Sequence, residues 1–415
     1  MKRILTLFQL AVIQGGNALF PLFAFPYILI KVGDGAFSKI VLSEALAMYV
    51  LTFSLYSYDI TGVSEIIGKV KTGKTADVLA VKIKIIMARL FVFSIISGVI
   101  SVFIYIFDRS LIWCFILWLM LPLGTIFQSN FFHQATNSNK TLALLVTFFR
   151  VTSLIILLVS DLNKNDVYFI IFVMSASYLA SGLITFFSSL IKYRRICNSI
   201  KIVHPSEIFM SLKNGFVLFL SNICVILYRN SNVVILGLVS TPSAVAMYAT
   251  AEKIIKSIQA LSGPLNQFYF TRLVHSNISA SKLIDYPFFK KIWDNTKWQL
   301  AMLSLVISCV VLLIVELANL ATLAKNIINV TPLLVIMSFS IFVGVCNYMF
   351  GVVGMSLVAN ERLFLLFSCI TGCISIGVAL LLSYKFGQFG AAVSYVMAEI
   401  TLFFFVMSFY FRRVF

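Results

Sequence analysis

The chain has 415 residues, of which 60% are hydrophobic and 11% charged, and its mean hydropathy is +1.01. No water-soluble domain of this length has such a composition, so the sequence predicts a polytopic membrane protein with little mass outside the bilayer. The formal net charge of +17 would suit a nucleic-acid partner in a soluble protein, but in a membrane protein a cationic excess usually reflects topology, and no nucleic-acid partner is expected.

In chain order, the apolar runs predict an all-α chain with about twelve transmembrane helices, because each run approaches or exceeds the roughly 20 residues needed to cross a bilayer. The charged start, Met1-Lys2-Arg3, leads into a span too long for a cleavable signal peptide. The expected spans are 8–31, 40–62, 90–107, 111–135, 142–160, 167–190, 214–239, 245–270, 298–318, 329–351, 362–383 and 388–411.

The distribution of Lys and Arg predicts the orientation of these spans. The loops on the side that holds both termini carry 22 cations, and the opposite loops carry 6. Because such an excess marks the cytoplasm, both termini are expected to be cytoplasmic in an inner-membrane protein. The basic stretch 191–213 is the expected linker between an N-terminal half, 1–190, and a C-terminal half, 214–415. The stretch 63–89 is compatible with a helix lying on the anionic inner leaflet.

The most informative region is a hairpin of two long apolar runs between Gly215 and Gln267. A weak copy of it lies 208 residues earlier, so that Glu252 corresponds to Glu44. A chain built from two such halves is a common plan among transporters. The hairpin carries charges inside its spans, and a charge at mid-bilayer is costly enough that it should face a partner or a water-filled cavity.

These intramembrane polar residues form the candidate site. The proposed cavity ligands are Arg150, Arg229, Lys253, Asn17 and Asn222. The candidates for ion coupling or ion pairing are Glu44, Glu252, Lys256 and Glu399. Glu252 and Lys256 are spaced i, i+4 with the acid first, the order that favours an ion pair within a helix, so the pair is either structural or functional.

Arg229 lies near the centre of its span and has no acidic residue three or four positions away. An arginine cannot lose its charge to escape burial, so Arg229 is expected either to contact an anionic substrate or to pair with Glu252, Glu316 or Glu399 on another helix.

Two prolines, Pro21 and Pro26, fall in the first span. Each removes a backbone hydrogen bond, which predicts a kink or a hinge that bends during a transport cycle.

Signatures of catalysis are missing from the sequence. It contains no Walker A motif, no HExxH motif and no paired cysteines with metal-ligand spacing, so no cofactor and no metal are expected. A membrane-embedded polysaccharide polymerase or ligase would need a long outer loop with an acidic or histidine-containing site, and the expected outer loops are too short. The sequence therefore favours a transporter over an enzyme.

Two motifs resemble those of a known family. The run Asn17-Ala18-Leu19-Phe20-Pro21-Leu22-Phe23-Ala24-Phe25-Pro26-Tyr27 resembles the first helix of O-antigen flippases. The run Val234-Ile235-Leu236-Gly237, followed by Ala246 to Ile254, resembles the signature of the polysaccharide-transporter branch of the multidrug/oligosaccharidyl-lipid/polysaccharide (MOP) superfamily. The chain departs from the family at the end of its fourth span, where only Phe127-Gln128 of a longer pattern is kept.

The resemblance implies two six-helix bundles facing each other across a central cavity, and transport by alternating access. It implies that the substrate is an undecaprenyl-diphosphate-linked oligosaccharide, moved from the cytoplasmic to the periplasmic leaflet for lipopolysaccharide biosynthesis, with other polysaccharide assembly proteins as partners. A diphosphate would prefer the cations at 150, 229 and 253. The alternatives are a lipid II flippase and a cation-coupled drug antiporter of the same superfamily.

Overall fold

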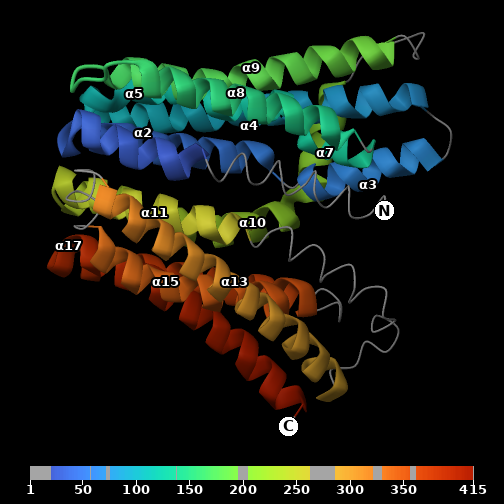
Figure 1. Ribbon diagram of the computed structural model, residues 1–415. Helices are drawn as coiled ribbons and strands as arrows, with labels where there is room; N and C mark the ends of the chain where they lie inside the picture. The colour runs from blue at the N-terminus through green and yellow to red at the C-terminus, as the bar shows by residue number, and fades with distance from the viewer. Residues whose placement is uncertain are drawn as a thin grey trace. The chain divides into compact units, whose positions relative to one another are not determined.

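A computed structural model describes residues 20–56, 58–71, 75–136, 138–194, 204–261, 286–320, 330–355 and 361–414 (Figure 1). Within these ranges every regular element is a helix. Seven of the described segments are long and apolar enough to cross a membrane: Asp34–Leu55, Asp77–Phe107, Arg109–Ala135, Lys140–Val159, Val167–Lys192, Thr331–Gly354 and Arg362–Arg413. The protein is therefore an all-α polytopic membrane protein, as its composition predicts.

The chain packs into two compact units. The early unit is Lys39–Ile226, and the late unit combines Met1–Ser38 with Leu227–Phe415. Their boundaries fall inside two continuous helices, α2 (Asp34–Leu55) and α10 (Pro205–Val239). The expected division into membrane bundles at 1–190 and 214–415 stays a prediction.

The early unit is assembled around α9 (Val167–Arg194), which packs against α5, α6 and α8. Two glycines let α6 and α9 approach closely: a Cβ added at Gly182 would lie 2.2 Å from the carbonyl oxygen of Gly124. Close backbone approach at small residues is a common way for membrane helices to associate. Besides most of α2 and the first part of α10, the described residues of the unit include α3 (Tyr58–Lys71), α4 (Thr75–Phe107), α5 (Ile112–Trp118), α6 (Met120–Gln128), α7 (Asn130–Ala135) and α8 (Asn139–Val159).

The expected single span 40–62 is interrupted in the structure. Helix α2 ends at Leu55, Tyr56 takes a left-handed backbone conformation with φ 54°, and α3 begins at Tyr58. The side chain of Tyr56 explains the break, because its hydroxyl donates to the carbonyl oxygen of Leu212 at 2.8 Å and its ring stacks on Phe219 at 4.0 Å. Because these contacts with α10 join segments that lie far apart in the sequence, no local sequence pattern predicts them.

The expectation of a leaflet-lying helix within 63–89 is wrong for its second half. Helix α4 runs without interruption from Thr75 to Phe107, and both Lys82 and Arg89 are buried within the unit. The two cations are satisfied internally: Arg89 pairs with Asp59 at 2.9 Å, and the Lys82 amine lies 4.5 Å from the ring centroid of Phe132. Lys82 and Arg89 therefore do not show where α4 leaves the membrane.

The late unit begins with an apolar helix, Phe20–Val32, which Gly33 (φ 76°) separates from α2. Its other helices among the described residues are the end of α10, α11 (Pro242–Leu261), α13 (Tyr286–Leu320), α15 (Thr331–Cys346), a π-helix η3 (Asn347–Gly354) and α17 (Glu361–Val414). Helix α15 packs against α11, α13 and α17. Inside α17 the backbone departs from helical geometry at Gly387 (φ 55°), which confirms a break between the expected spans 362–383 and 388–411.

Candidate functional site

The late unit brings together five of the charged residues that the sequence singles out. Arg229 lies on α10, Glu252, Lys253 and Lys256 lie on α11, and Glu399 lies on α17. They form two ion pairs and one cation–aromatic contact, all from helices that are otherwise apolar.

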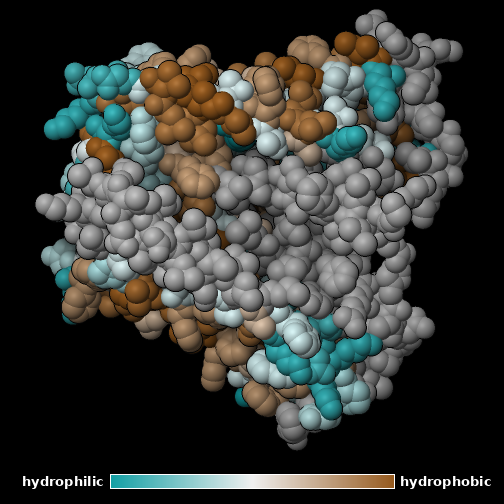
Figure 2. Space-filling view, viewed as in Figure 1, coloured by the Kyte–Doolittle hydropathy of each residue, from teal (hydrophilic) through white to brown (hydrophobic). Residues whose placement is uncertain are grey.

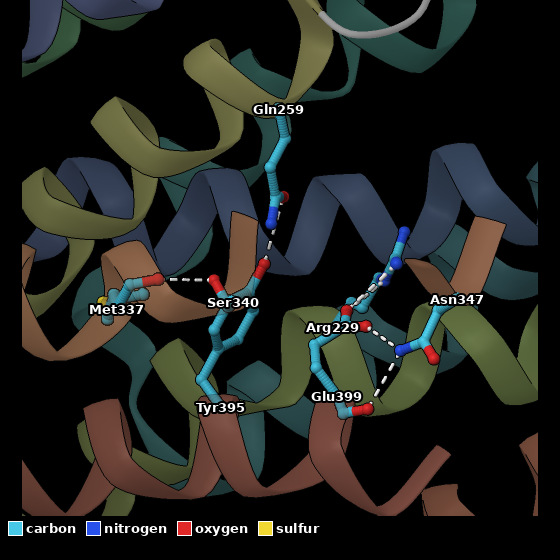
Figure 3. A network of polar contacts seen from close by, with 7 residues as sticks. All are labelled: Arg229, Gln259, Met337, Ser340, Asn347, Tyr395 and Glu399. Carbon is cyan, nitrogen blue, oxygen red and sulfur yellow. Dashed lines mark hydrogen bonds and ion pairs between the residues drawn. The ribbon is translucent and has the colours of Figure 1, made fainter. Parts of the chain in front are cut away.

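The first pair is centred on Glu399, whose side chain is 1% exposed. Its Oε1 accepts from Arg229 Nε at 3.1 Å and lies 3.0 Å from Arg229 Nη2. Asn347 Nδ2 donates to the other carboxylate oxygen, Oε2, at 2.8 Å and to the backbone carbonyl of the same glutamate at 2.9 Å. Figure 3 shows Arg229 and Asn347 reaching this one carboxylate from different helices. Of the three acids that could pair with Arg229, Glu399 is therefore a partner, and the side chain of Glu316 lies outside the described residues.

The π-helix η3 places Asn347 beside Glu399. Two glycines allow η3 to lie close to its neighbours: a Cβ added at Gly354 would lie 2.2 Å from the Tyr410 hydroxyl, and one added at Gly351 would lie 2.5 Å from the ring of Phe364. π-helical segments inside α-helices are rare and occur frequently at functional sites. The close packing of η3 therefore fixes the position of Asn347, which hydrogen-bonds to Glu399.

The second pair lies on α11. Lys256 Nζ is 2.9 Å from Glu252 Oε1 and donates to Asn230 Oδ1 at 2.8 Å. The i, i+4 spacing thus produces the ion pair that it predicts. One turn away, the Lys253 amine lies 4.6 Å from the centroid of the Phe25 ring, a cation–aromatic contact with helix Phe20–Val32.

In each of the two pairs the cation is more exposed than the acid. The acids are buried, with side chains 1% exposed at Glu399 and 4% at Glu252, whereas the cations are 38% exposed at Arg229 and 33% at Lys256. A ligand that approaches either pair therefore meets the cation first. Buried carboxylates that hold partly exposed cations make a site suited to an anionic or phosphate-bearing group.

The remaining candidate residues lie elsewhere. Arg150 on α8, in the early unit, is 2% exposed, donates to Ser177 Oγ at 2.6 Å and has its guanidinium carbon 3.1 Å from the ring centroid of Tyr178. Ser177 and Tyr178 both lie on α9, so Arg150 contributes to the packing of α8 against α9. Glu44 on α2 is also buried.

Two prolines lie in a helix that is continuous over the described residues. Pro21 falls in the first described turn of Phe20–Val32, and Pro26 falls in its middle. Their role as hinges stays a prediction. Asn17 lies outside the described residues, as does the side chain of Asn222.

Sequence reasoning missed the neutral polar residues that support the charges. Asn347 bonds to Glu399, and the buried Tyr395 donates to Gln259 Oε1 at 3.4 Å (Figure 3). A signal existed for Asn347, because it interrupts an apolar span between Cys346 and Tyr348. Over the described ranges, no group of three or more His, Cys, Asp or Glu side chains is placed to hold a metal ion.

In a comparison with protein families, residues 6–274 match the family described as "Polysaccharide biosynthesis protein". Two relatives carry the name "Putative O-antigen transporter". The one from Escherichia coli (strain K12) is 25% identical over 273 residues, 64% of this chain and 63% of the relative, and the one from Shigella dysenteriae is 24% identical over 296 residues, 70% of each chain. The match thus spans less than two thirds of the E. coli protein.

Solved structures with the same fold include two kinds of transporter. The lipid II flippase MurJ in an inward closed conformation has a TM-score of 0.63, 16% identity, and coverage of 98% of this chain and 86% of that one. An inward-facing multidrug resistance MATE family transporter of the MOP superfamily has a TM-score of 0.60, 12% identity, and coverage of 98% and 94%. At these identities the likeness establishes the fold.

Proposed function

Because the chain belongs to the polysaccharide biosynthesis protein family, we propose that it is a flippase for a lipid-linked oligosaccharide. The cargo is an undecaprenyl-diphosphate-linked oligosaccharide, such as an O-antigen repeat unit, moved from the cytoplasmic to the periplasmic leaflet of the inner membrane by alternating access. The names of the two relatives support the transport of O-antigen, and the fold shared with a flippase and a multidrug transporter supports transport by a membrane-embedded helical protein.

One observation carries the choice of cargo: in the Arg229–Glu399 pair and in the Lys256–Glu252 pair the cation is the more exposed partner. The invariant part of the cargo is its diphosphate, which the guanidinium fork of Arg229 and the amines of Lys253 and Lys256 would recognise. Neutral polar groups, including Asn17 and Asn222, are proposed to contact sugar hydroxyls.

Arg229 is proposed as the main diphosphate contact. Its Nε and Nη2 are oriented by the buried Glu399, which is itself fixed by Asn347. A preoriented guanidinium loses less side-chain entropy on binding than a mobile one. Glu399, Glu252 and Glu44 are the proposed coupling groups, and Pro21 and Pro26 the proposed hinges.

The drug antiporter is the second candidate, and it is favoured by the fold shared with a multidrug transporter. A cationic drug requires an accessible carboxylate, and Glu252 and Glu399 are buried behind their cationic partners. The site therefore supports an anionic cargo better than a cationic one.

Complementation tests the proposed function. The chain is expressed in a bacterial strain that lacks its own O-antigen flippase, and surface O-antigen and protein level are both measured. We expect the wild-type chain to restore surface polysaccharide, Arg229→Lys to restore part of it, and Arg229→Ala to restore none at an equal protein level. Restored export by Arg229→Ala, or increased resistance to cationic drugs without export by the wild-type chain, would contradict the proposal.

A further inference from the structure

We propose that the first turns of α13 and the last turn of α17 form a binding surface for the headgroups of anionic phospholipids. This headgroup surface consists of Tyr286, Lys290, Trp293 and Lys297 on α13 and Arg412 and Arg413 on α17. None of these residues belongs to the Arg229–Glu399 pair or to the Lys256–Glu252 pair, and the surface does not depend on the cargo.

Four residues of α13 form a stripe on one side of the helix. Positions 286, 290, 293 and 297 are spaced by four, three and four residues, so they share a face. That face is exposed: Tyr286 is 54% exposed, Trp293 is 43% exposed, and Lys290 and Lys297 are exposed as well. Ile292 on the opposite side is fully buried. Aromatic and basic side chains thus alternate along the outer face.

The end of α17 adds two further cations at the same place. Phe289 on α13 lies 6.1 Å from Tyr410 and 6.3 Å from Phe411, measured between ring centroids. The next two residues, Arg412 and Arg413, are exposed. Figure 2 shows a hydrophilic patch at the lower right, over the region where Figure 1 places the start of α13.

The length of α13 places this stripe at the depth of lipid headgroups. The helix has 35 residues, whereas about 20 suffice for a hydrocarbon core of about 30 Å. If the span begins at residue 298, as the hydropathy predicts, Lys297 lies about 1.5 Å and Lys290 about 12 Å before it. The headgroup layer on one side is roughly 5–8 Å thick, so the stripe crosses it, and lysine stems can extend toward phosphates.

The charge of the surface favours anionic over zwitterionic lipids. It contains four cations, and the neighbouring acid Asp294 pairs with Lys297 at 2.7 Å. Hydrogen bonding from Lys297 lowers the pKa of the Asp294 carboxyl, so this acid stays ionised at neutral pH and compensates one cation. Lys290, Arg412 and Arg413 carry the remaining charge. Tryptophan and tyrosine between basic residues are typical of a membrane interface, which favours a lipid over an acidic protein segment.

A lipid-binding measurement on the full chain in detergent tests this proposal. Phosphatidylglycerol, phosphatidylcholine, inorganic phosphate and an acidic peptide are each added, and binding is followed by native mass spectrometry and by the melting temperature. The test variant is K290Q/R412Q/R413Q. The matched control is R109Q/K164Q/K385Q, which removes three exposed cations far from these turns in sequence.

We expect the affinity for phosphatidylglycerol to fall about fivefold for each cation removed, or roughly 100-fold in the test variant, and to change little in the control. K290Q alone is expected to give about a fivefold loss, which guards against a folding defect in the triple variant. The proposal is overturned if both triple variants lose binding equally, or if phosphatidylcholine binds as tightly. It is equally overturned if inorganic phosphate or the acidic peptide binds the surface as tightly as phosphatidylglycerol.

Discussion

Removing Arg229 separates its structural role from its functional one, because its partner Glu399 is almost fully buried. Arg229→Ala would leave the Glu399 carboxylate with Asn347 as its nearest hydrogen-bond donor, at 2.8 Å. Removing one partner of a fully buried ion pair typically destabilises a protein by about 3–5 kcal/mol. Since the Arg229 side chain is 38% exposed, solvent screens part of its interaction with Glu399, and we expect Arg229→Ala to lower the free energy of unfolding by about 1–3 kcal/mol.

The double variant Arg229→Ala with Glu399→Gln should recover that stability. Glutamine is neutral, and its Oε1 can still accept the hydrogen bond from Asn347 Nδ2, so no charge is left buried. The melting temperatures of the wild-type chain, the two single variants and the double variant are measured in detergent and form a double-mutant cycle. We expect a coupling free energy between Arg229 and Glu399 of about 1–3 kcal/mol. The exposed Lys164→Gln serves as a control for charge removal, with an expected change below about 0.5 kcal/mol.

Transport then decides the role of Arg229. If it contacts the diphosphate, the double variant is stable yet exports no more polysaccharide than Arg229→Ala. If the double variant exports at the wild-type rate, Arg229 serves only as the counter-ion of Glu399, and the proposed diphosphate contact is refuted.

Three further predictions follow from the packing and the charge distribution. Gly182→Ala should destabilise the early unit by about 1–3 kcal/mol, measured by melting and expression level, whereas Gly98→Ala, where nothing lies within 4 Å of the added Cβ, should be neutral. Lys82→Met should leave the melting temperature unchanged or raised, because an apolar side chain suits the rings of Phe132 and Phe186 and the Ser189 hydroxyl, to which Lys82 donates, itself bonds the carbonyl oxygen of Phe186; a loss above about 1 kcal/mol would contradict this. Topology reporters should give a cytoplasmic signal at Lys201 and Lys282 and a periplasmic signal at Lys164 and Lys385, and the reverse at Lys201 would overturn the proposed orientation.

Helix positions could be predicted wherever a hydrophobic run has clear ends. The expected spans 142–160 and 167–190 correspond to α8 and α9, with ends within four residues. The internal offset of 208 residues is also reflected in the structure, because α2 begins at Asp34 and α11 at Pro242. Hydropathy predicts these helices because a membrane-spanning helix needs an apolar run long enough to cross the hydrocarbon core.

Features set by contacts between distant segments could not be predicted. The break at Tyr56 depends on Leu212 and Phe219, which lie more than 150 residues away. Glu399, which pairs with Arg229, is 170 residues away from it, so the sequence could name three candidate acids and not choose among them. The i, i+4 pair of Glu252 and Lys256 was predictable, because its geometry is local.

The central claim is tested most directly by transport in vesicles that contain the purified full chain and a fluorescent undecaprenyl-diphosphate-linked oligosaccharide. Accessibility of the sugar to an added impermeant glycosidase reports the leaflet that holds it. We expect the wild-type chain to make cargo of the inner leaflet accessible within the assay, and Arg229→Ala to leave it protected as in protein-free vesicles. Protection that is equal with and without the wild-type chain, together with uptake of a cationic dye by the same vesicles, would contradict the proposed cargo.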